Sequence, residues 1–256
     1  MNDPKNEEMS RREFQRDALR SVLAFTLLDL LATNDLFAEE VKPLAVKWLQ
    51  DVNQIATDLK DQKIKQAEWQ KSVEELFAKV ELRSLLGLVD FDRLEKGVSY
   101  PDRGARSLRC EFLELAGVPA KIAFGRQIFA LKKGRSVVPH GHNNMATGFI
   151  ILKGSFHGRH YDRVEDEAEH MIIKPTIDRD FKPGEYSTVT DFKDNVHWFK
   201  AKDEPAFIFN LHLLGVNPGS TKRTGRIYID PDGEKIKDGL VRARLISEDE
   251  GDRLYG

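Results

Sequence analysis

Two histidines separated by one residue are the side chains whose type and spacing point most directly to chemistry. His140 and His142 stand in a short run that is typical of a strand. Side chains alternate between the two faces of a strand, so both imidazoles face the same side and can meet one metal ion. Gly141 between them adds no bulk on the other face. The alternative is a turn that carries two solvated histidines.

The glycines around this pair resemble a known motif. Gly134 opens the segment and Gly154 closes the next one, as turns at the two ends of a paired strand would. Counted from Gly134 through the two histidines and Thr147 to Gly154, the spacing resembles the first motif of the cupin superfamily throughout. Thr147 is the one chemical departure, because that motif usually carries a metal-binding glutamate at this place.

A second, looser likeness supplies a third histidine. Gly184 and His197 resemble the glycine and the histidine of the second cupin motif, whereas Phe192 and Asp194 replace its inner proline and glycine. The resemblance implies a jelly-roll barrel of roughly six to eight strands, with His197 and the two histidines of the first motif as metal ligands at its mouth. The alternative for His197 is a core histidine hydrogen-bonded to the backbone.

A metal site of three histidines without a carboxylate resembles one branch of that superfamily, the thiol dioxygenases that include cysteine dioxygenase. The likeness covers roughly residues 108–225. Residues 204–206 and 211–213 resemble the late strand of these enzymes, and His212 follows His197 at the distance of a histidine that supports their metal site. The resemblance implies non-haem iron as cofactor, with dioxygen and a small thiol as the reactants.

Three residues depart from that branch. Thr147 stands where many mammalian-type members have a cysteine, and Leu214 where they have a tyrosine, so their thioether crosslink has neither partner here. Asn210 stands where the branch has a serine hydrogen-bonded to the histidine. These departures favour a relative that acts on another small substrate over a true cysteine dioxygenase.

The resemblance also implies roles for residues around the metal. Its substrate-binding arginine aligns best with Arg109, for which an exposed salt bridge is the alternative role. Arg126 is a second candidate, because an arginine among the apolar residues of a barrel strand can face the interior. Thr147 is expected beside the substrate. His212 and Asn210 are expected as catalytic residues that tune the metal ligands, with a purely structural histidine as the alternative for His212.

Three neutral imidazoles would hold a divalent ion from one side and leave up to three positions open for water, substrate and dioxygen. Neutral ligands leave the charge of the site near that of the ion, about +2, which favours an anionic donor such as a thiolate or an enolate. Fe(II) suits the activation of dioxygen, while Zn, Ni or Mn would also accept imidazole ligands.

We therefore expect a metal-dependent enzyme, a dioxygenase of the cysteine dioxygenase-like cupin type with non-haem iron, which acts on a small anionic substrate such as a thiol. Two alternatives use the same residues. One is a cupin that binds a small ligand and performs no redox chemistry, which Thr147 and the eroded second motif favour. The other is a metal-dependent isomerase or lyase built on the same three histidines.

The predicted elements fit a mainly β fold with helices at its start. Residues 1–101 have helical periodicity, with apolar positions such as Trp69, Val73 and Phe77 on one face of a helix. We expect this region to form a small helical layer packed against the rest of the chain. The helices are expected at 14–31, 44–59 and 69–97, the last ending at Gly97.

Residues 102–225 differ in character and form the expected cupin barrel domain. Short runs, most of them rich in Val, Ile, Phe and Leu, alternate with glycine and proline turns, which is typical of a sandwich or barrel. Residues 226–256 are expected to add a hairpin, with Asp230-Pro231-Asp232-Gly233 as its turn, and a solvated acidic tail. The runs of the barrel cover residues 107–115, 121–131, 147–161, 171–177 and 205–214.

The other histidines and the single cysteine have plainer interpretations. His157, His160 and His170 lie among charged residues and are expected in solvent. Cys110 is expected as a small, reduced core residue. One cysteine excludes an intramolecular disulfide and a cysteine-based zinc finger.

Composition excludes several classes of protein. The 256 residues include 40 basic and 42 acidic side chains, a formal charge of −2, which argues against a nucleic-acid partner. Apolar residues make up 40% of the chain, and no run approaches the roughly 18 apolar residues of a membrane span. A cytoplasmic protein is expected, with a twin-arginine export signal beginning at Ser10-Arg11-Arg12 as the alternative. A homodimer would fit the resemblance, because cupins often pair through edge strands.

Overall fold

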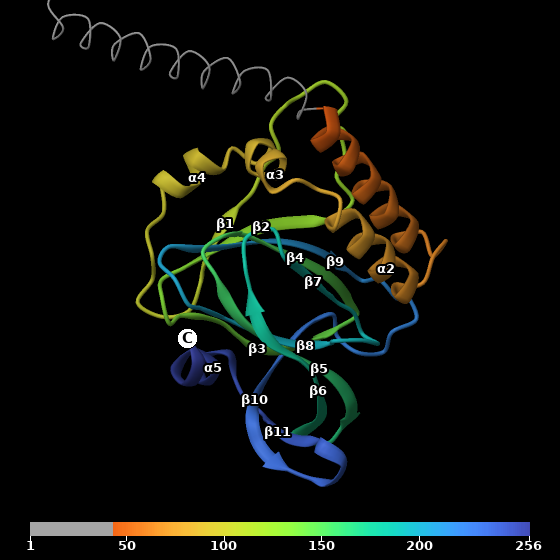
Figure 1. Cartoon of the computed structure of the whole chain (residues 1–256). Coiled ribbons are helices and arrows are strands. Elements are labelled where there is room, and N and C mark those ends of the chain that lie inside the picture. Colours follow the sequence, from red (N-terminus) through yellow and green to blue (C-terminus); the bar gives the residue numbers. More distant parts are fainter. Residues whose placement is uncertain (1–42) are drawn as a thin grey trace, which may run out of the picture. The chain divides into compact units, whose positions relative to one another are not determined.

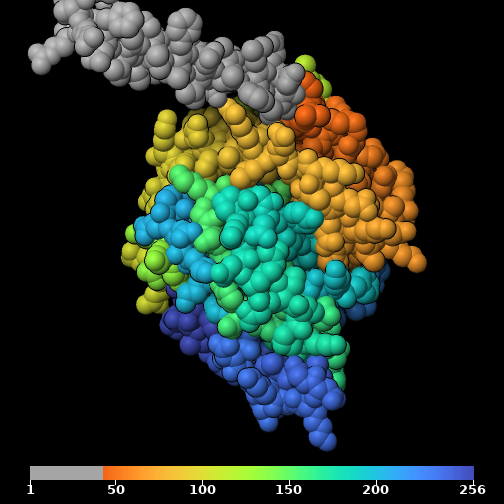
Figure 2. Space-filling view, in the orientation of Figure 1, coloured from red at the N-terminus to blue at the C-terminus, as the bar shows by residue number. Residues whose placement is uncertain are grey.

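Two antiparallel sheets stacked face to face dominate the computed structural model, which describes residues 43–256 (Figure 1). Helices cover the outer face of one sheet, and the other sheet closes on itself as a barrel. In the space-filling view the helices, in orange and yellow, lie at the opposite end from the last strands, in blue (Figure 2). The expected helix at 14–31 and the Ser10-Arg11-Arg12 segment lie outside the described residues.

The helices follow the predicted apolar periodicity. The first described helix spans residues 43–60 and buries Val52 and Ala56 on one face. This helix confirms the prediction at 44–59 within one residue at each end. α2 (Gln66–Phe77) buries its predicted apolar face in the same core. The single helix expected at 69–97 is wrong. The segment forms three helices, α2, α3 (Leu82–Leu88) and α4 (Phe91–Lys96), because the chain turns at residues 78–79 and again at Asp90, which adopts a left-handed conformation with φ 49°.

The first sheet has five strands in the order β1-β2-β9-β4-β7. Ile128 and Ala130 of β2 pack against the helices, whereas Phe129 and Leu131 face the space between the sheets. Because both faces of the central strands β2, β9 and β4 carry buried residues, much of each reads as an apolar run. β1 ends at Arg109, short of the run expected to reach residue 115. The strands are β1 (Arg106–Arg109), β2 (Gly125–Leu131), β4 (Met145–Lys153), β7 (Tyr186–Val189) and β9 (Ala206–Leu214).

The second sheet is a closed barrel in the order β10-β11-β6-β5-β8-β3. Pairing of β10 with β3 completes the ring, so the barrel includes strands that follow residue 225. The expected acidic tail forms α5 (Glu248–Tyr255), whose first turn is capped by the Ser247 side chain. The barrel strands are β3 (Ser136–Asn143), β5 (Phe156–Asp166), β6 (His170–Phe181), β8 (Val196–Ala201), β10 (Gly225–Lys235) and β11 (Val241–Leu245).

The hairpin turn expected at Asp230-Pro231-Asp232-Gly233 is wrong. β10 runs through this segment, and its register with β11 shifts between Asp230 and Glu234. The extra residues form a bulge, and the chain reverses at η1 (Lys237–Gly239) instead. Pairing along the whole strand therefore overrides a local turn signal.

Phenylalanines fill much of the space between the two sheets. The Phe199 ring lies 5.3 Å from that of Phe149, 5.4 Å from that of Phe181 and 6.4 Å from that of Phe156, measured between centroids. The expected fold class, a mainly β jelly-roll barrel preceded by helices, is thus confirmed. Among residues 43–256, no helix is long and apolar enough to cross a membrane.

Phe77 joins the helices to the first sheet and provides a test of this packing. Its ring is buried against Gly148 of β4 and lies edge-to-face with Tyr186 of β7. Phe77→Ala is expected to lower the free energy of unfolding by about 3–5 kcal/mol, because it leaves a cavity between α2 and the sheet. Urea denaturation followed by tryptophan fluorescence measures this change.

The control for that experiment is Leu254→Ala, on an exposed position of α5. It should change the free energy of unfolding by no more than about 0.5 kcal/mol. Equal effects of the two substitutions would contradict the packing described for α2.

Candidate metal centre

A bulge in β3 turns the histidine pair toward the interior. β3 and β8 pair at Val137 with Phe199 and again at His140 with His197, so β3 has one residue more than β8 between these pairs. Pro139, which has no N–H for the ladder, stands in this bulge. Residues 137 and 140 therefore face the same side, and residue 142 follows by alternation.

His140, His142 and His197 meet between the sheets. The centroid of the His140 ring lies 4.2 Å from that of His197 and 5.0 Å from that of His142, and the last two lie 4.9 Å apart. One ring nitrogen from each residue lies within 4.8 Å of those from the other two. All three residues are at most 2% exposed. The structure thus brings the three predicted ligands into one cluster.

The ring nitrogens of this cluster have few partners within the protein. His140 Nδ1 donates to the Val138 carbonyl at 2.7 Å, so the proton of the neutral ring is on Nδ1 and Nε2 carries a free lone pair. That Nε2 and both ring nitrogens of His197 are buried without a hydrogen bond. His142 Nδ1 lies 3.3 Å from Thr147 Oγ1. Buried polar atoms are rarely left without a partner, so the donor set fits a bound divalent ion.

Burial keeps these imidazoles uncharged. Burial, followed by the charge of Arg226, lowers the pKa of His142 to about 3. The same two causes hold the pKa of His140 well below its ordinary value. For His197, burial and the neighbouring His140 and His142 have this effect on the pKa. Neutral imidazole is the form that binds metal, so the three ligands need to lose no proton at neutral pH.

A cavity of about 240 Å³ borders the three histidines. The second sheet and the first sheet each provide one wall of it. No aspartate or glutamate is among the described residues that line this cavity. Its other polar lining residues are Gln127, Thr147, Asn210, His212 and Arg226, and its apolar ones are Phe129, Val137, Met145, Phe149 and Leu214.

The predicted residues His212, Asn210 and Thr147 lie on the wall that faces the ligands. His212 Nδ1 donates to Asn210 Oδ1 at 3.0 Å, and burial lowers the pKa of His212. The imidazole lies over Gly125 of β2: a Cβ there would be 2.6 Å from His212 Cε1 and closer still to Nε2. The absence of a side chain at Gly125 therefore leaves the space that the His212 ring occupies.

The two predicted arginines lie outside the cavity. The Arg109 side chain is 89% exposed and pairs with Glu111. Arg126 also pairs with Glu111 and lies over the Phe112 ring, 5.0 Å from its centroid. Gln127 of the same strand lines the cavity. Side chains alternate along a strand, so the neighbouring Arg126 faces away from the cavity.

Arg226 is the arginine that the cavity contains, and sequence reasoning missed it. It lies on β10 directly opposite His142, and residues opposite each other in an antiparallel pair face the same side. The segment Arg226 to Ile229 belongs to the part of the chain expected to be a hairpin. Ile227, Tyr228 and Ile229 form a strand-like run directly after Arg226. An arginine next to such a run could have been predicted to lie on a barrel strand.

His160 is buried, so the expected solvent exposure is wrong. It lies on β5 opposite His197 and stacks on the Phe181 ring, with an angle of 15° between the planes. Ser187 Oγ lies 3.4 Å from its Nε2. Strand alternation places His160 inside even though its neighbours are charged. His157 is partly exposed beside Asp178 and Asp180.

Comparisons with known proteins find similar folds only. No protein-family model matches the sequence, and no curated protein matches it. Among solved structures, a protein with a double-stranded β-helix domain from Klebsiella pneumoniae is similar at 13% identity and a TM-score of 0.34, over 52% of this chain and 85% of that one.

Two further structures are similar to a comparable part of the chain. A cupin superfamily protein from Desulfitobacterium hafniense has 14% identity and a TM-score of 0.30, over 46% of this chain and 84% of that one. Recombinant oxalate oxidase in complex with glycolate has 14% identity and a TM-score of 0.34, over 52% of this chain and 58% of that one. These similarities assign no activity to this chain. Its own fold and site define a mainly β barrel protein with a candidate three-histidine metal centre.

The position of the His212 ring can be tested through Gly125. Gly125→Ala is expected to push the imidazole off β2 and toward solvent, because the new methyl group would overlap it. The pKa of His212, now lowered by burial, should then rise toward its ordinary value. A histidine NMR titration measures this pKa, with His212→Gln to assign the resonance.

Gly97→Ala is the matched control, since a Cβ there has its nearest neighbours at an ordinary 3.8 Å. That variant should leave the pKa of His212 unchanged. If Gly125→Ala also leaves it unchanged, the ring does not lie over β2 as described.

Proposed function

We propose that this protein is a metal-dependent oxidoreductase, a non-haem iron dioxygenase of the cysteine dioxygenase-like type, acting on a small anionic substrate such as a thiol. The observation that carries the proposal is the convergence of three buried, uncharged imidazoles on one cavity. His140, His142 and His197 would hold Fe(II), and Zn, Ni or Mn are other ions that such ligands accept. When bound, the ion supplies a site at which dioxygen and substrate can meet.

The charges of the cavity support an anionic substrate. Arg226 is the one formally charged side chain among the described lining residues. A divalent ion would add to that positive charge, because the imidazole ligands are neutral. A substrate with a carboxylate for Arg226 and a second anionic donor for the ion would give each of the two positive groups an anionic partner. We therefore propose Arg226, in place of Arg109 and Arg126, as the residue that binds the substrate carboxylate.

The facing wall supports proton transfer and exclusion of water. With its Nδ1–H bonded to Asn210 Oδ1, His212 keeps Nε2 free to accept a proton. Gln127 Nε2 approaches the same oxygen at 3.5 Å and helps to hold the Asn210 amide in this orientation. Phe129 and Phe149 make part of the wall apolar, which limits access of water to reactive oxygen species.

A second candidate function is a metal-dependent isomerase or lyase. The observation that favours it is His212, a base held by a hydrogen bond in the wall opposite the three histidines. His140, His142 and His197 would hold the ion, which would polarise a substrate carbonyl, and His212 would accept the proton, so this chemistry needs no dioxygen. Product formation under anaerobic conditions would favour this function over the dioxygenase.

Metal content tests the ligand set. Untagged protein, loaded anaerobically with Fe(II) and desalted, is expected to retain about one iron per chain by elemental analysis. His140→Ala, His142→Ala and His197→Ala should each lose it, because two imidazoles hold a divalent ion far more weakly than three. His157→Ala is the matched control, since His157 is partly exposed beside acidic residues outside the cavity.

Equal iron retention in all four variants would contradict the assignment of His140, His142 and His197 as metal ligands. No iron in the unsubstituted protein would leave a barrel that binds a small ligand without metal chemistry as the better account.

Oxygen consumption tests the reaction and the role of Arg226. Iron-loaded protein is expected to consume dioxygen with cysteine or 3-mercaptopropionate, which carry a carboxylate, and with cysteamine, which lacks one. Arg226→Gln should raise KM at least about tenfold for the first two, because a charged hydrogen bond is lost, and leave KM for cysteamine nearly unchanged. Arg126→Gln is the control, expected to change neither value.

Equal effects of Arg226→Gln on all three thiols would contradict the carboxylate contact. Absence of oxygen uptake with every thiol would count against a thiol dioxygenase and direct the search to the anaerobic reactions.

A further inference from the structure

The backbone of His142 lies where the β3–β8 ladder ends. The last paired residues are His140 and His197, and β8 begins at Val196. Asp194 has a left-handed conformation with φ 53°, and the chain turns away there. On its other side His142 pairs with Arg226 of β10. On the β8 side, no backbone within residues 43–256 pairs with His142.

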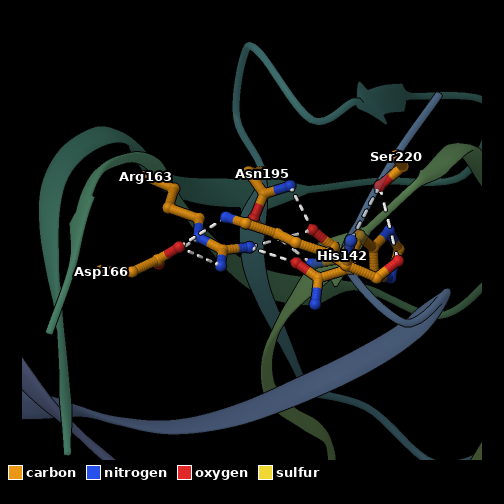
Figure 3. A network of polar contacts seen from close by, with 7 residues as sticks. His142, Arg163, Asp166, Asn195 and Ser220 are labelled. Atoms are coloured by element: carbon orange, nitrogen blue, oxygen red, sulfur yellow. Dashed lines mark hydrogen bonds and ion pairs between the residues drawn. The ribbon is translucent and has the colours of Figure 1, made fainter. Parts of the chain in front are cut away.

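The side chain of Asn195 takes that missing place (Figure 3). Its Oδ1 accepts from the His142 backbone N–H at 3.3 Å, and its Nδ2 donates to the His142 carbonyl at 2.9 Å. Nδ2 also donates to the Thr190 carbonyl at 3.0 Å. A carboxamide offers one donor and one acceptor group, as a peptide does. It therefore substitutes for the next pair of the ladder.

Gly141 is required for this contact. A Cβ at residue 141 would lie 2.9 Å from Asn195 Oδ1 and 3.2 Å from Val196 Cγ2. Only glycine lets the carboxamide approach the backbone this closely. Strand alternation requires only that one residue separate the two histidines. The contact with Asn195 explains why that residue is glycine.

A charged group supports the same carbonyl from another direction. The Arg163 guanidinium donates to the His142 carbonyl at 3.3 Å and to Asn143 Oδ1 at 2.6 Å. It is held by Asp166 in a two-point ion pair at 2.6 and 2.7 Å. Figure 3 shows Asn195 and Arg163 meeting at His142. The carbonyl of one proposed ligand is thus fixed by two separate side chains.

From this geometry we infer that Asn195 is a positioning residue of the metal centre: it holds the His142 backbone so that the imidazole meets those of His140 and His197. The inference rests on the proposed metal-binding function. Convergence of three ligand nitrogens requires each backbone to be fixed within a fraction of an ångström. Residues outside the coordination sphere that orient a ligand typically change metal affinity by about 10- to 100-fold when they are replaced.

The chain offers a matched control in Asn53. Its Nδ2 donates to the Lys121 carbonyl at 3.1 Å, and its Oδ1 accepts from the Ala123 N–H at 2.7 Å. This is the same two-point contact to backbone, made from the helix at 43–60 and away from the cavity-lining residues. Asn53→Ala therefore removes comparable hydrogen bonds without touching a proposed ligand.

The test is titration of the metal-free protein with Co(II), followed by the visible absorption that reports its coordination. Asn195→Ala is expected to bind Co(II) at least about tenfold more weakly and with a changed spectrum. The Co(II) affinity of Asn53→Ala should stay within about twofold of that of the unsubstituted protein, with the same spectrum. This should hold even if its melting temperature falls as much as that of Asn195→Ala. Gly141→Ala should reproduce the effect of Asn195→Ala, since its methyl group displaces the carboxamide.

The outcomes separate this inference from the function on which it rests. If the unsubstituted protein binds no Co(II), the metal centre fails and the inference fails with it. If that protein binds Co(II), and Asn195→Ala and Gly141→Ala bind it with unchanged affinity and spectrum, only the positioning role is overturned. Should Asn195→Ala not fold, as judged by circular dichroism, the Gly141→Ala result decides.

Discussion

Burial of uncharged imidazoles is the constraint on which the site depends. His140, His142 and His197 lie between two sheets, and His197 has no hydrogen-bond partner for either ring nitrogen. An unsatisfied buried polar group costs about 1–3 kcal/mol, so the rest of the fold has to stabilise this arrangement. The phenylalanines around Phe199 supply apolar burial beside it, and the β3 bulge aims the histidine pair at His197. A bound cation would give the free nitrogens their partner.

The two sheets have different tasks at this site. The barrel sheet carries the three histidines on β3 and β8 and brings Arg226 on β10. The helix-covered sheet provides the opposite wall, with Asn210 and His212 on β9. Its central strands β2, β9 and β4 contribute buried residues on both faces, so each polar residue on their inner face interrupts an otherwise apolar surface. Positive charge gathers on one wall of the cavity, and hydrogen-bonding groups gather on the other.

Strand alternation explains what the sequence predicts here and what it does not. A spacing of two places His140 and His142 on one face whatever strand pairs with them, and apolar periodicity is enough for the helices and the mainly β fold. The same alternation cannot say which face of a doubly buried strand meets a cavity, so the prediction for Arg126 is one residue out of phase. Arg226 is missed because a local turn signal lies in its strand, and only pairing with distant strands reveals that β10 continues. His160 is placed inside by its register, which its charged neighbours conceal.

Closure of the barrel also bears on how copies of this chain can come into contact. A sheet that closes on itself offers no row of unpaired backbone groups to another polypeptide. Within residues 43–256, the open edges therefore belong to the five-stranded sheet, at β1 and β7. Each of these strands is only four residues long. Short edges resist uncontrolled strand addition, so a chain rich in buried β structure gains protection from aggregation through its topology, independent of surface charge.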